Sequence, residues 1–453
     1  MEEKLTERLY ELFIQHPEVT TDSRRCPAGS MFFALKGESF DGNYFAAKAL
    51  ETGSAVAVVD DSAVVPAGDE RYVLVPDVLQ ALQALAAHHR RQFKGPVLQV
   101  TGTNGKTTTK ELLAAVLSRR YRVLYTQGNL NNHIGVPLTL LRLRPEHELA
   151  IIETGANHPG EIAFLTDIVQ PDYGLITNVG RAHLEGFGSF EGVKRTKGEL
   201  YDFLGQKPTA QLFVNASSKD ILGMLAERDI DINTGKCIVY AHEGEKTDAL
   251  CYGAVMRCDP MLHIRWTGRD GVSYEAATQL IGDYNLDNVL AAVAAGLHFG
   301  ISAKDIAAAL EGYHPSLGRS EYRKTVHNEL IIDAYNANLT SMMAALANFR
   351  NIEQPKKMVI LGDMRELGTA SEAAHKTVVE AVFDGGRIER AWFVGENFEE
   401  ALKGVCKPDG IEITCFKDVE AVKQEIEKTQ PDGWLILIKG SNSTKLHQLP
   451  DIL

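Results

Sequence analysis

The sequence predicts an α/β protein of three domains, and two observations carry this prediction. The chain has 453 residues, which at about 150 residues per domain corresponds to roughly three domains. From residue 97 onward, short apolar runs alternate with stretches of helical apolar spacing, a pattern typical of a largely parallel sheet with helical connections. We place the domains at 1–94, 95–317 and 318–453.

Residues 1–94 are the predicted N-terminal domain. Short apolar stretches alternate with turns there, and residues 72–75 are one predicted strand. A helical pattern at 79–93 is followed by Lys-Gly-Pro at 94–96. A Gly-Pro pair is a common linker signal, so the domain is expected to end at this point.

The central domain is predicted to hold a mostly parallel sheet. A helix at 107–120 follows the first strand, and helices at 286–298 and 303–310 close the domain. Alternating strands between about 237 and 279 predict a small antiparallel appendage. The strands of the parallel sheet are predicted at 97–101, 123–126, 149–154, 174–178 and 212–215.

The last third of the chain predicts a compact, doubly wound domain of the Rossmann-like kind. Its amphipathic segments, expected to be helices, are 340–349, 372–382 and 419–428. Its predicted strands are 330–333, 358–361, 391–394, 411–416 and 434–438.

Composition and charge exclude several classes of protein. Apolar residues make up 44% and charged residues 24%, as in a folded globular protein. With 47 Lys and Arg against 60 Asp and Glu, the net charge is −13, so no basic field would attract nucleic acid or an anionic membrane. The N-terminus is too polar and acidic for a signal peptide, and no apolar run approaches about 20 residues. We expect a cytoplasmic protein without membrane insertion or nucleic-acid partners.

Six cysteines are scattered along the chain without a Cys-x-x-Cys pair. Neither a disulfide framework nor a zinc site is therefore predicted. We interpret the cysteines as packing residues.

The strongest chemical signal is a phosphate-binding loop, Thr-Gly-Thr-Asn-Gly-Lys-Thr-Thr-Thr at 101–109, between a strand and a helix. Such a loop turns backbone N–H groups onto phosphate oxygens, Lys106 can reach the outer phosphates, and the Thr107 hydroxyl can bind Mg²⁺. Full Walker A spacing needs glycine at Val100, so the loop is a shorter variant. An ordinary glycine-rich turn with a stray lysine is the alternative. The predicted ATP-binding residues of the loop are Gly102, Thr103, Asn104, Gly105, Lys106, Thr107 and Thr108.

Polar residues at later strand ends extend the predicted site. Glu153 ends one apolar run, and the carboxyl ends of parallel strands converge on the ligand crevice, where a carboxylate can hold Mg²⁺. A helix cap or a solvated turn is the alternative for Glu153. Taken singly, His183 could be a hydrogen-bonded loop histidine and Lys197 a solvated charge.

Taken together, the motifs resemble the Mur ligases of peptidoglycan synthesis, and the likeness spans nearly the whole chain. The segments that carry it are the phosphate loop, 128–137, 153–162, 182–188 and 197–199 in the centre, with 21–24, 32–37, 333–338, 361–368 and 439–441 outside it.

The resemblance implies a three-domain ligase with a UDP-sugar domain, a central P-loop ATPase and a C-terminal domain that closes over the site. ATP would phosphorylate a substrate carboxylate, and an amine would attack the acyl phosphate. The segments are most similar to family members that join D-alanyl-D-alanine to UDP-N-acetylmuramoyl-tripeptide, so these are the expected substrates, and a monomer is expected. Whether the tripeptide ends in lysine or diaminopimelate stays open.

The resemblance also assigns roles to individual residues. It places Lys106 on the phosphates, Thr107 and Glu153 on Mg²⁺, His183 on a second metal, and a carbamylated Lys197 beside it; a lysine must be neutral to react with CO₂. The expected catalytic residues are Lys106, Glu153, His183 and Lys197. Asn285 and Asn288 would contact adenine, although Asn285 could instead cap the following helix, and Arg319 and Asp333 would reach the nucleotide. The expected substrate-binding residues are Ser23, Arg24, Asn129, Asn131, Asn132, His133, Tyr335, Asn336 and Asn338.

Two residues depart from the family pattern, and several rival functions remain. Leu339 stands where the family usually has proline, and Asn442 where it usually has arginine. The nearest rivals are a sister Mur ligase and a folylpolyglutamate-type synthetase. A catalytically silent nucleotide-binding scaffold is a rival of another class, and a P-loop kinase is disfavoured because no separate general base presents itself.

Overall fold

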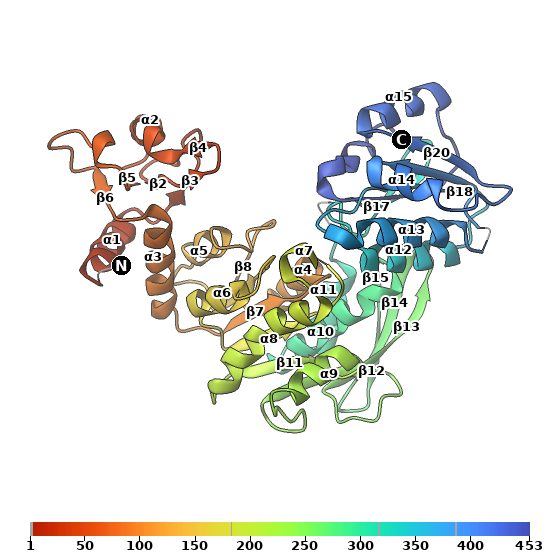
Figure 1. Cartoon of the computed structure of the whole chain (residues 1–453). Helices are drawn as coiled ribbons and strands as arrows, with labels where there is room; N and C mark the ends of the chain where they lie inside the picture. The colour runs from red at the N-terminus through yellow and green to blue at the C-terminus, as the bar shows by residue number, and fades with distance from the viewer. Residues whose placement is uncertain (1–2, 183, 316–317, 386) are drawn as a thin grey trace.

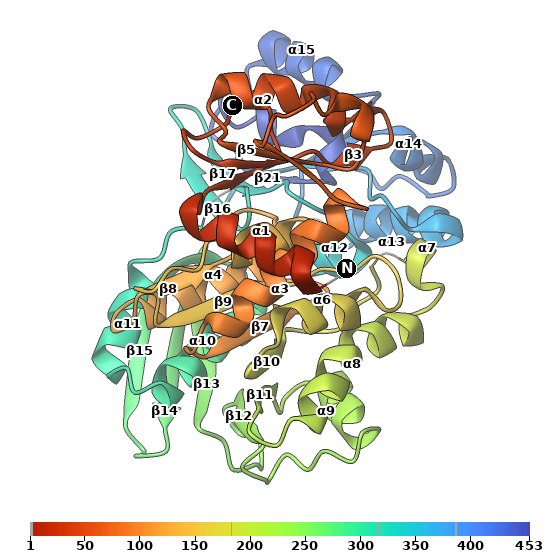
Figure 2. The same cartoon turned by 90° about the vertical axis from the view of Figure 1, so that its left-hand side faces the viewer.

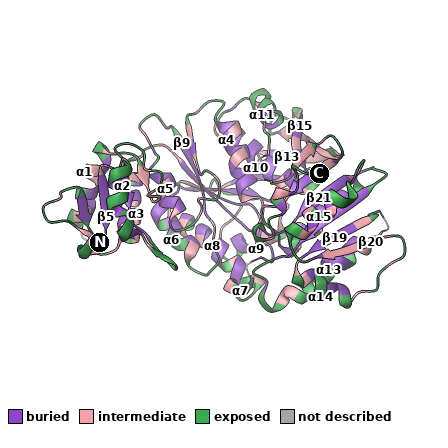
Figure 3. Ribbon diagram, turned by 90° about the horizontal axis from the view of Figure 1, so that it is seen from above, coloured by how far each residue is buried: buried purple, intermediate pink, exposed green. Residues whose placement is uncertain are grey.

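The computed structural model describes residues 3–182, 184–315, 318–385 and 387–453. Figure 1 shows three domains in a row, with the N-terminal domain at one end, the central domain in the middle and the C-terminal domain at the other end. Buried strands form the interior of each domain, and exposed residues lie along the outer helices and loops (Figure 3). The predicted α/β class with largely parallel sheets is confirmed.

The N-terminal domain is built on a parallel sheet in the order β1-β2-β5-β6. Helix α3 begins where the Asp77 carboxylate accepts the Gln80 N–H at 2.8 Å, and α1 packs beside it (Figure 2). The elements are α1 (Glu3–Gln15), β1 (Val19–Thr20), β2 (Met31–Phe33), β3 (Lys36–Gly37), β4 (Phe40–Asp41), α2 (Ala46–Thr52), β5 (Val56–Val59), β6 (Tyr72–Leu74) and α3 (Val78–Gln92).

The apolar face of α3 joins the N-terminal and central domains. Leu82 and Leu85 of α3 lie in one buried cluster with Val136, Leu140 and Ile168, which belong to the central domain. The first two domains therefore share a core across the Gly-Pro linker.

The first part of the central domain alternates strands and helices as predicted. The elements are β7 (Val97–Thr101), α4 (Lys106–Leu117), β8 (Val123–Tyr125), α5 (Gly135–Leu140), β9 (Leu149–Glu153), α6 (Glu161–Val169), β10 (Tyr173–Ile176), α7 (Leu184–Phe187), α8 (Phe190–Gln206), β11 (Gln211–Asn215) and α9 (Lys219–Ala226).

The predicted antiparallel appendage is wrong as a separate unit. Its strands continue the central sheet, whose order is β15-β14-β13-β12-β11-β10-β7-β9-β8. Strand β12 pairs in parallel with β11 and with β13, and only β13–β14 and β14–β15 are antiparallel. The alternating pattern arises because one face of these strands packs on α10 and α11. The elements are β12 (Cys237–His242), β13 (Cys251–Cys258), β14 (Met261–Gly268), β15 (Ser273–Ile281), α10 (Leu286–His298) and α11 (Ala303–Glu311).

The C-terminal domain holds a six-stranded sheet in the order β16-β17-β21-β18-β19-β20, parallel except for β16. The sequence missed the charged edge strand β16 and the short helix α14. The elements are β16 (Glu321–Lys324), β17 (Glu329–Asp333), α12 (Leu339–Asn351), β18 (Lys357–Gly362), α13 (Ser371–Phe383), β19 (Arg390–Val394), α14 (Glu396–Lys403), β20 (Glu412–Phe416), α15 (Val419–Thr429) and β21 (Leu435–Lys439).

The cysteines are all free thiols, in agreement with the absence of a disulfide framework in the sequence prediction. Cys251 is buried in the core, but Cys406 is exposed just after α14, so its interpretation as a packing residue is wrong. In the part of the chain that the structure describes, no helix combines the length and apolar character needed to cross a membrane.

Candidate active site

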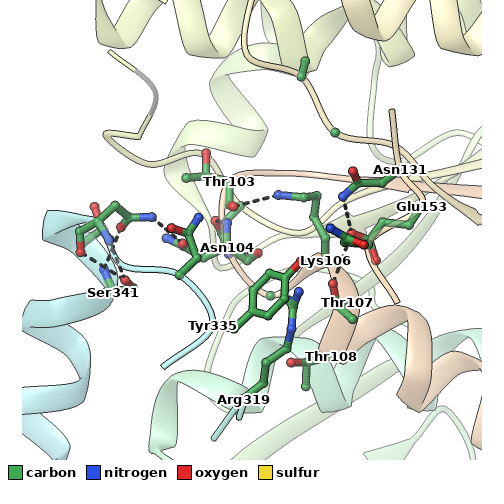
Figure 4. Close-up of a pocket in the computed structure, with 18 of the residues that line it drawn as sticks. Thr103, Asn104, Lys106, Thr107, Thr108, Asn131, Glu153, Arg319, Tyr335 and Ser341 are labelled. Atoms are coloured by element: carbon green, nitrogen blue, oxygen red, sulfur yellow. Dashed lines mark hydrogen bonds between the residues drawn. The ribbon is translucent and has the colours of Figure 1, made fainter. Parts of the chain in front are cut away.

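A cavity of about 760 Å³ lies between the carboxyl ends of central strands and the start of the C-terminal domain. Figure 4 shows how side chains from both domains point into it. The predicted site residues that line it are Thr103, Asn104, Gly105, Lys106, Thr107, Thr108, Asn129, Asn131, Asn132, His133, Glu153, Asn285, Asn288, Arg319, Asp333, Tyr335, Asn336 and Asn338.

The phosphate loop needs glycine at two of its positions. Gly105 has φ +76°, and a Cβ there would lie 2.5 Å from Oδ1 of Asn288. Gly102 has φ +143°, and a Cβ there would lie 2.1 Å from Oγ1 of Thr177. Both positions combine a positive φ with a close neighbour, so any side chain would displace the loop.

The end of β10 holds the loop in place. The Asn104 N–H donates to Oδ1 of Asn178 at 3.0 Å. The Asn104 carbonyl accepts from Thr177 Oγ1 at 2.7 Å and from Asn178 Nδ2 at 3.0 Å. The sequence placed these two residues at a strand end but assigned them no role in the site.

Lys106 folds back onto its own loop. Its ammonium donates to the carbonyls of Gly102 at 2.8 Å and Thr103 at 2.9 Å. Burial lowers the pKa of Lys106. The Lys106 ammonium is therefore bound by two loop carbonyls. When a nucleotide binds, phosphate oxygens could replace these carbonyls as its acceptors.

Glu153 is buried, with 1% of its surface exposed, so the alternative of a solvated turn residue is wrong. Its Oε1 accepts from Thr107 Oγ1 at 3.1 Å and from Asn131 Nδ2 at 2.8 Å. Its Oε2 is buried and has no hydrogen-bond partner among the described residues. The carboxylate is held firmly on one oxygen while the other keeps unused acceptor capacity.

The Thr107–Glu153 pair fits a magnesium ion. Mg²⁺ prefers oxygen ligands at about 2.0–2.1 Å in an octahedron, so two adjacent ligands lie about 3 Å apart. The 3.1 Å between Thr107 Oγ1 and Glu153 Oε1 matches this separation. Within the described ranges, which leave out His183, no cluster of three or more acidic, histidine or cysteine side chains could hold a metal alone.

Lys197 is buried in helix α8, so the alternative of a solvated charge is wrong. Its ammonium lies 5.5 Å from the centroid of the Phe187 ring. Burial, assisted by the nearby charge of Lys106, lowers the pKa of Lys197 to about 7. A large neutral fraction at neutral pH follows. Lys197 does not line the cavity. His183 lies outside the described residues, so its role as a metal ligand stays a prediction.

The amides of Asn285 and Asn288 form a chain that ties α10 to α4. Asn285 Nδ2 donates to the Ile281 carbonyl at 2.7 Å, and Asn288 Nδ2 donates to Asn285 Oδ1 at 2.8 Å. Asn288 Oδ1 accepts from Thr109 Oγ1 at 3.0 Å. The Asn285 side chain makes no capping bond to α10, so the capping alternative is wrong.

A neighbouring acid at this end of the cavity escaped the sequence prediction. Asp287 lines the cavity, and its Oδ1 lies 2.7 Å from Nε2 of His242. This contact raises the pKa of His242. No local motif marks the pair, because 45 residues separate its members.

The C-terminal domain contributes Arg319 and Tyr335, which stack on each other. The Arg319 guanidinium carbon lies 3.7 Å from the Tyr335 ring centroid, and the two point into the cavity beside Lys106 (Figure 4). Arg319 Nε is buried and lacks a hydrogen-bond partner in the described part of the chain. Asp333 forms an ion pair with the buried Lys439, which also lines the cavity and which the sequence prediction did not include among the site residues.

Asn338 bridges the C-terminal domain and the phosphate loop. Its Oδ1 accepts the Ser341 N–H at 2.9 Å and caps α12, while its Nδ2 donates to Asn104 Oδ1 at 2.8 Å. Ser341 Oγ lies 3.2 Å from the Asn338 N–H and completes a capping box. This box fixes the helix start where Leu339 replaces the family proline.

Three residues that the sequence analysis singled out, Ser23, Arg24 and Asn442, lie away from the cavity. Ser23 and Arg24 do not line it, and Arg24 is exposed and paired with Asp22 at 2.8 Å. Asn442 begins a short 3₁₀ turn and does not line it either. A second cavity of about 450 Å³ lies between the first two domains and includes Asp22, together with Arg142 and Arg144, which the sequence did not single out.

Comparisons with known proteins agree along the whole chain. Residues 17–90 match the Mur ligase family catalytic domain, 100–296 the Mur ligase middle domain, and 318–442 the Mur ligase glutamate ligase domain. The chain is 36% identical to the UDP-N-acetylmuramoyl-tripeptide–D-alanyl-D-alanine ligase of Bacillus subtilis, covering 97% of this chain and 93% of that protein. It is 34% identical to the Escherichia coli enzyme of the same name, covering 95% of this chain and 92% of that protein.

Solved structures give the same result. A crystal structure of MurF from Acinetobacter baumannii is 32% identical, with a TM-score of 0.83 over 98% of this chain and 97% of that one. The MurF ligase of Thermotoga maritima in complex with ADP shares the fold, with 23% identity and a TM-score of 0.81 over 100% and 98%. The shared fold and the full-length identity lead to one assignment: the chain belongs to the Mur ligase family.

Proposed function

We propose that the chain joins D-alanyl-D-alanine to UDP-N-acetylmuramoyl-tripeptide at the expense of ATP, in the synthesis of peptidoglycan precursors. Relatives named for this activity are 30–36% identical over most of their length. The single observation that carries the proposal is the cavity in which Lys106, Thr107, Glu153 and Arg319 converge from two domains.

The cavity suits the transfer of a phosphoryl group to a carboxylate. Backbone N–H groups of the phosphate loop and the amino end of α4 would receive the ATP phosphates. Lys106 and Arg319 would offset the negative charge of the phosphates and of the attacking carboxylate, which otherwise repel each other. Thr107 and Glu153 would hold Mg²⁺, which when bound supplies further positive charge.

The two proposed steps need no reagent other than ATP and the two substrates. A carboxylate oxygen of the tripeptide attacks the γ-phosphorus, the bond to ADP breaks, and an acyl phosphate forms. The amine of D-alanyl-D-alanine then attacks the acyl carbon, phosphate leaves, and the amine loses a proton. The contact between Asn338 and the phosphate loop supports a role for the C-terminal domain in bringing these groups together.

The buried Lys197 supports a second part of the proposal, namely that CO₂ carbamylates this residue. A pKa of about 7 leaves much of the amine neutral and therefore reactive. The resulting anion would help to place a second Mg²⁺ together with His183. The Lys197→Ala variant should be nearly inactive, and a short carboxylate such as acetate should restore part of its activity.

We also propose that the enzyme works as a monomer in the cytoplasm, where ATP and UDP-linked precursors are found, with domain boundaries at 1–94, 95–317 and 318–453. Ser23, Arg24 and the loop at 129–133 would contact the UDP-linked substrate. The arginines beside Asp22 in the second cavity support a place there for its anionic part.

Phosphate release tests the proposal. The purified chain is supplied with ATP, Mg²⁺ and UDP-N-acetylmuramoyl-tripeptide in its lysine and diaminopimelate forms, with and without D-alanyl-D-alanine. We expect release that requires the dipeptide and a product mass equal to the joined substrates less one water. L-alanyl-L-alanine is the matched control. Intact ATP binding without turnover on either form would favour a sister ligase or a silent scaffold.

A further inference from the structure

Lys110 is a fully buried lysine that the proposed mechanism does not use. It lies one helical turn after Lys106 in α4, is 0% exposed, and its ammonium has no hydrogen-bond partner among the residues described. Its Nζ lies 3.9 Å from Oε2 of Glu153. An ammonium removed from water in this way is costly unless an opposite charge compensates it.

The two oxygens of Glu153 face two residues of the same helix. Thr107 and Lys110 are three positions apart, so they share one face of α4. Thr107 bonds Oε1, and Lys110 faces Oε2, the oxygen without a hydrogen-bond donor among the described residues. Helix α4 therefore brackets the carboxylate, with a hydroxyl on one side and a cation on the other.

The other neighbours of Lys110 compensate it less well. Glu111 Oε1 lies 3.7 Å away, but this carboxylate is partly exposed and accepts the Tyr313 hydroxyl at 2.6 Å. The Tyr125 ring centroid lies 5.8 Å from the ammonium, and the charge of Arg319 opposes it. Glu153 is thus its only fully buried acidic partner in the described part of the chain.

We propose that Lys110 is a positioning residue that acts as an internal countercharge, holding the Glu153 carboxylate against Thr107 until magnesium and nucleotide bind. The proposal rests on the assignment of Glu153 to Mg²⁺ made above. Because Lys110 and the metal would share one carboxylate, the lysine weakens metal binding while it stabilises the metal-free site. Loss of its charge should therefore have opposite effects on the two states.

Lys110→Met tests this directly, since methionine keeps much of the volume without the charge. The matched control is Lys357→Met, another buried lysine, whose ammonium bonds the Phe349 and Arg350 carbonyls in the C-terminal domain. Thermal unfolding with EDTA and with Mg²⁺ is measured for each protein. A Mg²⁺ titration of the binding of a fluorescent ADP analogue gives the half-saturating metal concentration.

We expect Lys110→Met to lower the unfolding temperature in EDTA, to recover part of the loss in Mg²⁺, and to lower the half-saturating Mg²⁺ concentration on the order of threefold to tenfold, because one repelling charge is gone. Lys357→Met should leave the metal dependence unchanged. Adding Glu153→Gln to Lys110→Met should restore metal-free stability relative to the single variant, since no unpaired charge remains.

Weaker or unchanged Mg²⁺ binding in Lys110→Met would overturn the proposal. Should this variant not fold, the double variant must fold better than the single one, and failure of both would also contradict it. If Mg²⁺ does not affect nucleotide binding in the unmodified chain, the metal assignment of the proposed function fails. The coupling between Lys110 and Glu153 in EDTA would then still be measured independently.

Discussion

Single residues in the phosphate loop serve both the fold and the site, and Gly105 is the sharpest case. Its backbone is left-handed, and its α-carbon faces Asn288 Oδ1, which Thr109 holds in place. Gly68 has nearly the same φ, +78°, but a Cβ added there would meet no heavy atom within 4 Å. A comparison of substitutions at the two glycines therefore distinguishes the effect of backbone strain, present at both, from that of a steric clash, present only at Gly105.

We predict that Gly105→Ala and Gly68→Ala each destabilise the chain by about 1–2 kcal/mol through the left-handed backbone. Only Gly105→Ala should also displace Asn288 and weaken nucleotide binding. Urea unfolding and ADP titration measure the two effects. Equal nucleotide affinity in both variants would show that the contact with Asn288 does not matter.

Lys197 predicts a pH dependence of stability. Its pKa is about 7 in the folded chain, against about 10.4 for an exposed lysine. Between these pH values the unfolded chain binds more protons, so the free energy of unfolding rises with pH.

Relative to Lys197→Met, the unmodified chain should gain stability by up to roughly 1.4 kcal/mol per pH unit between about pH 7 and 10. Urea unfolding in CO₂-free buffer at several pH values measures this gain. A stability difference between the two proteins that stays constant with pH would contradict the lowered pKa.

Among the secondary-structure elements, α12 shows how a helix start can also connect domains. Asn338 uses its carbonyl oxygen to cap α12 and its amide nitrogen to reach Asn104 in the phosphate loop. Serine also caps helices well but is too short to make the second contact.

Asn338→Ser should therefore keep nearly full stability and raise the KM for ATP about twofold to tenfold, the effect of one lost hydrogen bond. Asn338→Ala should additionally lose about 1 kcal/mol of stability. Ser341→Ala, which weakens the capping box alone, is the control. If Asn338→Ser and Ser341→Ala bind ATP equally well, the bridge has no functional effect.

The sequence predicted the elements around the site well because their signals are local. The strand, the glycines and the helix at 97–117 follow one another directly, and Glu153 ends an apolar run. Lys439 escaped inclusion in the site because its partner, Asp333, is 106 residues away. The appendage was misjudged because alternation reports which face of a strand is covered and not which sheet the strand joins.

For the whole molecule, the shared core beneath α3 links the first two domains. Leu85 is fully buried in the same cluster as Val136 and Ile168 of the central domain. The sheet of the C-terminal domain has one cluster on each face, and the cluster that holds Val378 also includes Ile281 of the central domain.

Leu85→Ala should cost about 2–5 kcal/mol and increase hydrogen exchange in the N-terminal and central domains together. Val378→Ala, a cavity in the C-terminal core, is the control and should leave exchange in the N-terminal domain unchanged. Increased exchange confined to residues before the linker would show that the two domains unfold separately.

The uneven environment of the thiols makes the natural chain suitable for site-selective labelling. Burial raises the pKa of Cys251 to about 12 and those of Cys237, Cys258 and Cys415 to about 11, which suppresses their reactive thiolates. Of the other two thiols, Cys26 is partly buried, whereas Cys406 is exposed on the C-terminal domain and does not line the large cavity. A maleimide dye should therefore attach there first, giving a fluorescent reporter on the domain that contacts the phosphate loop without a single engineered cysteine.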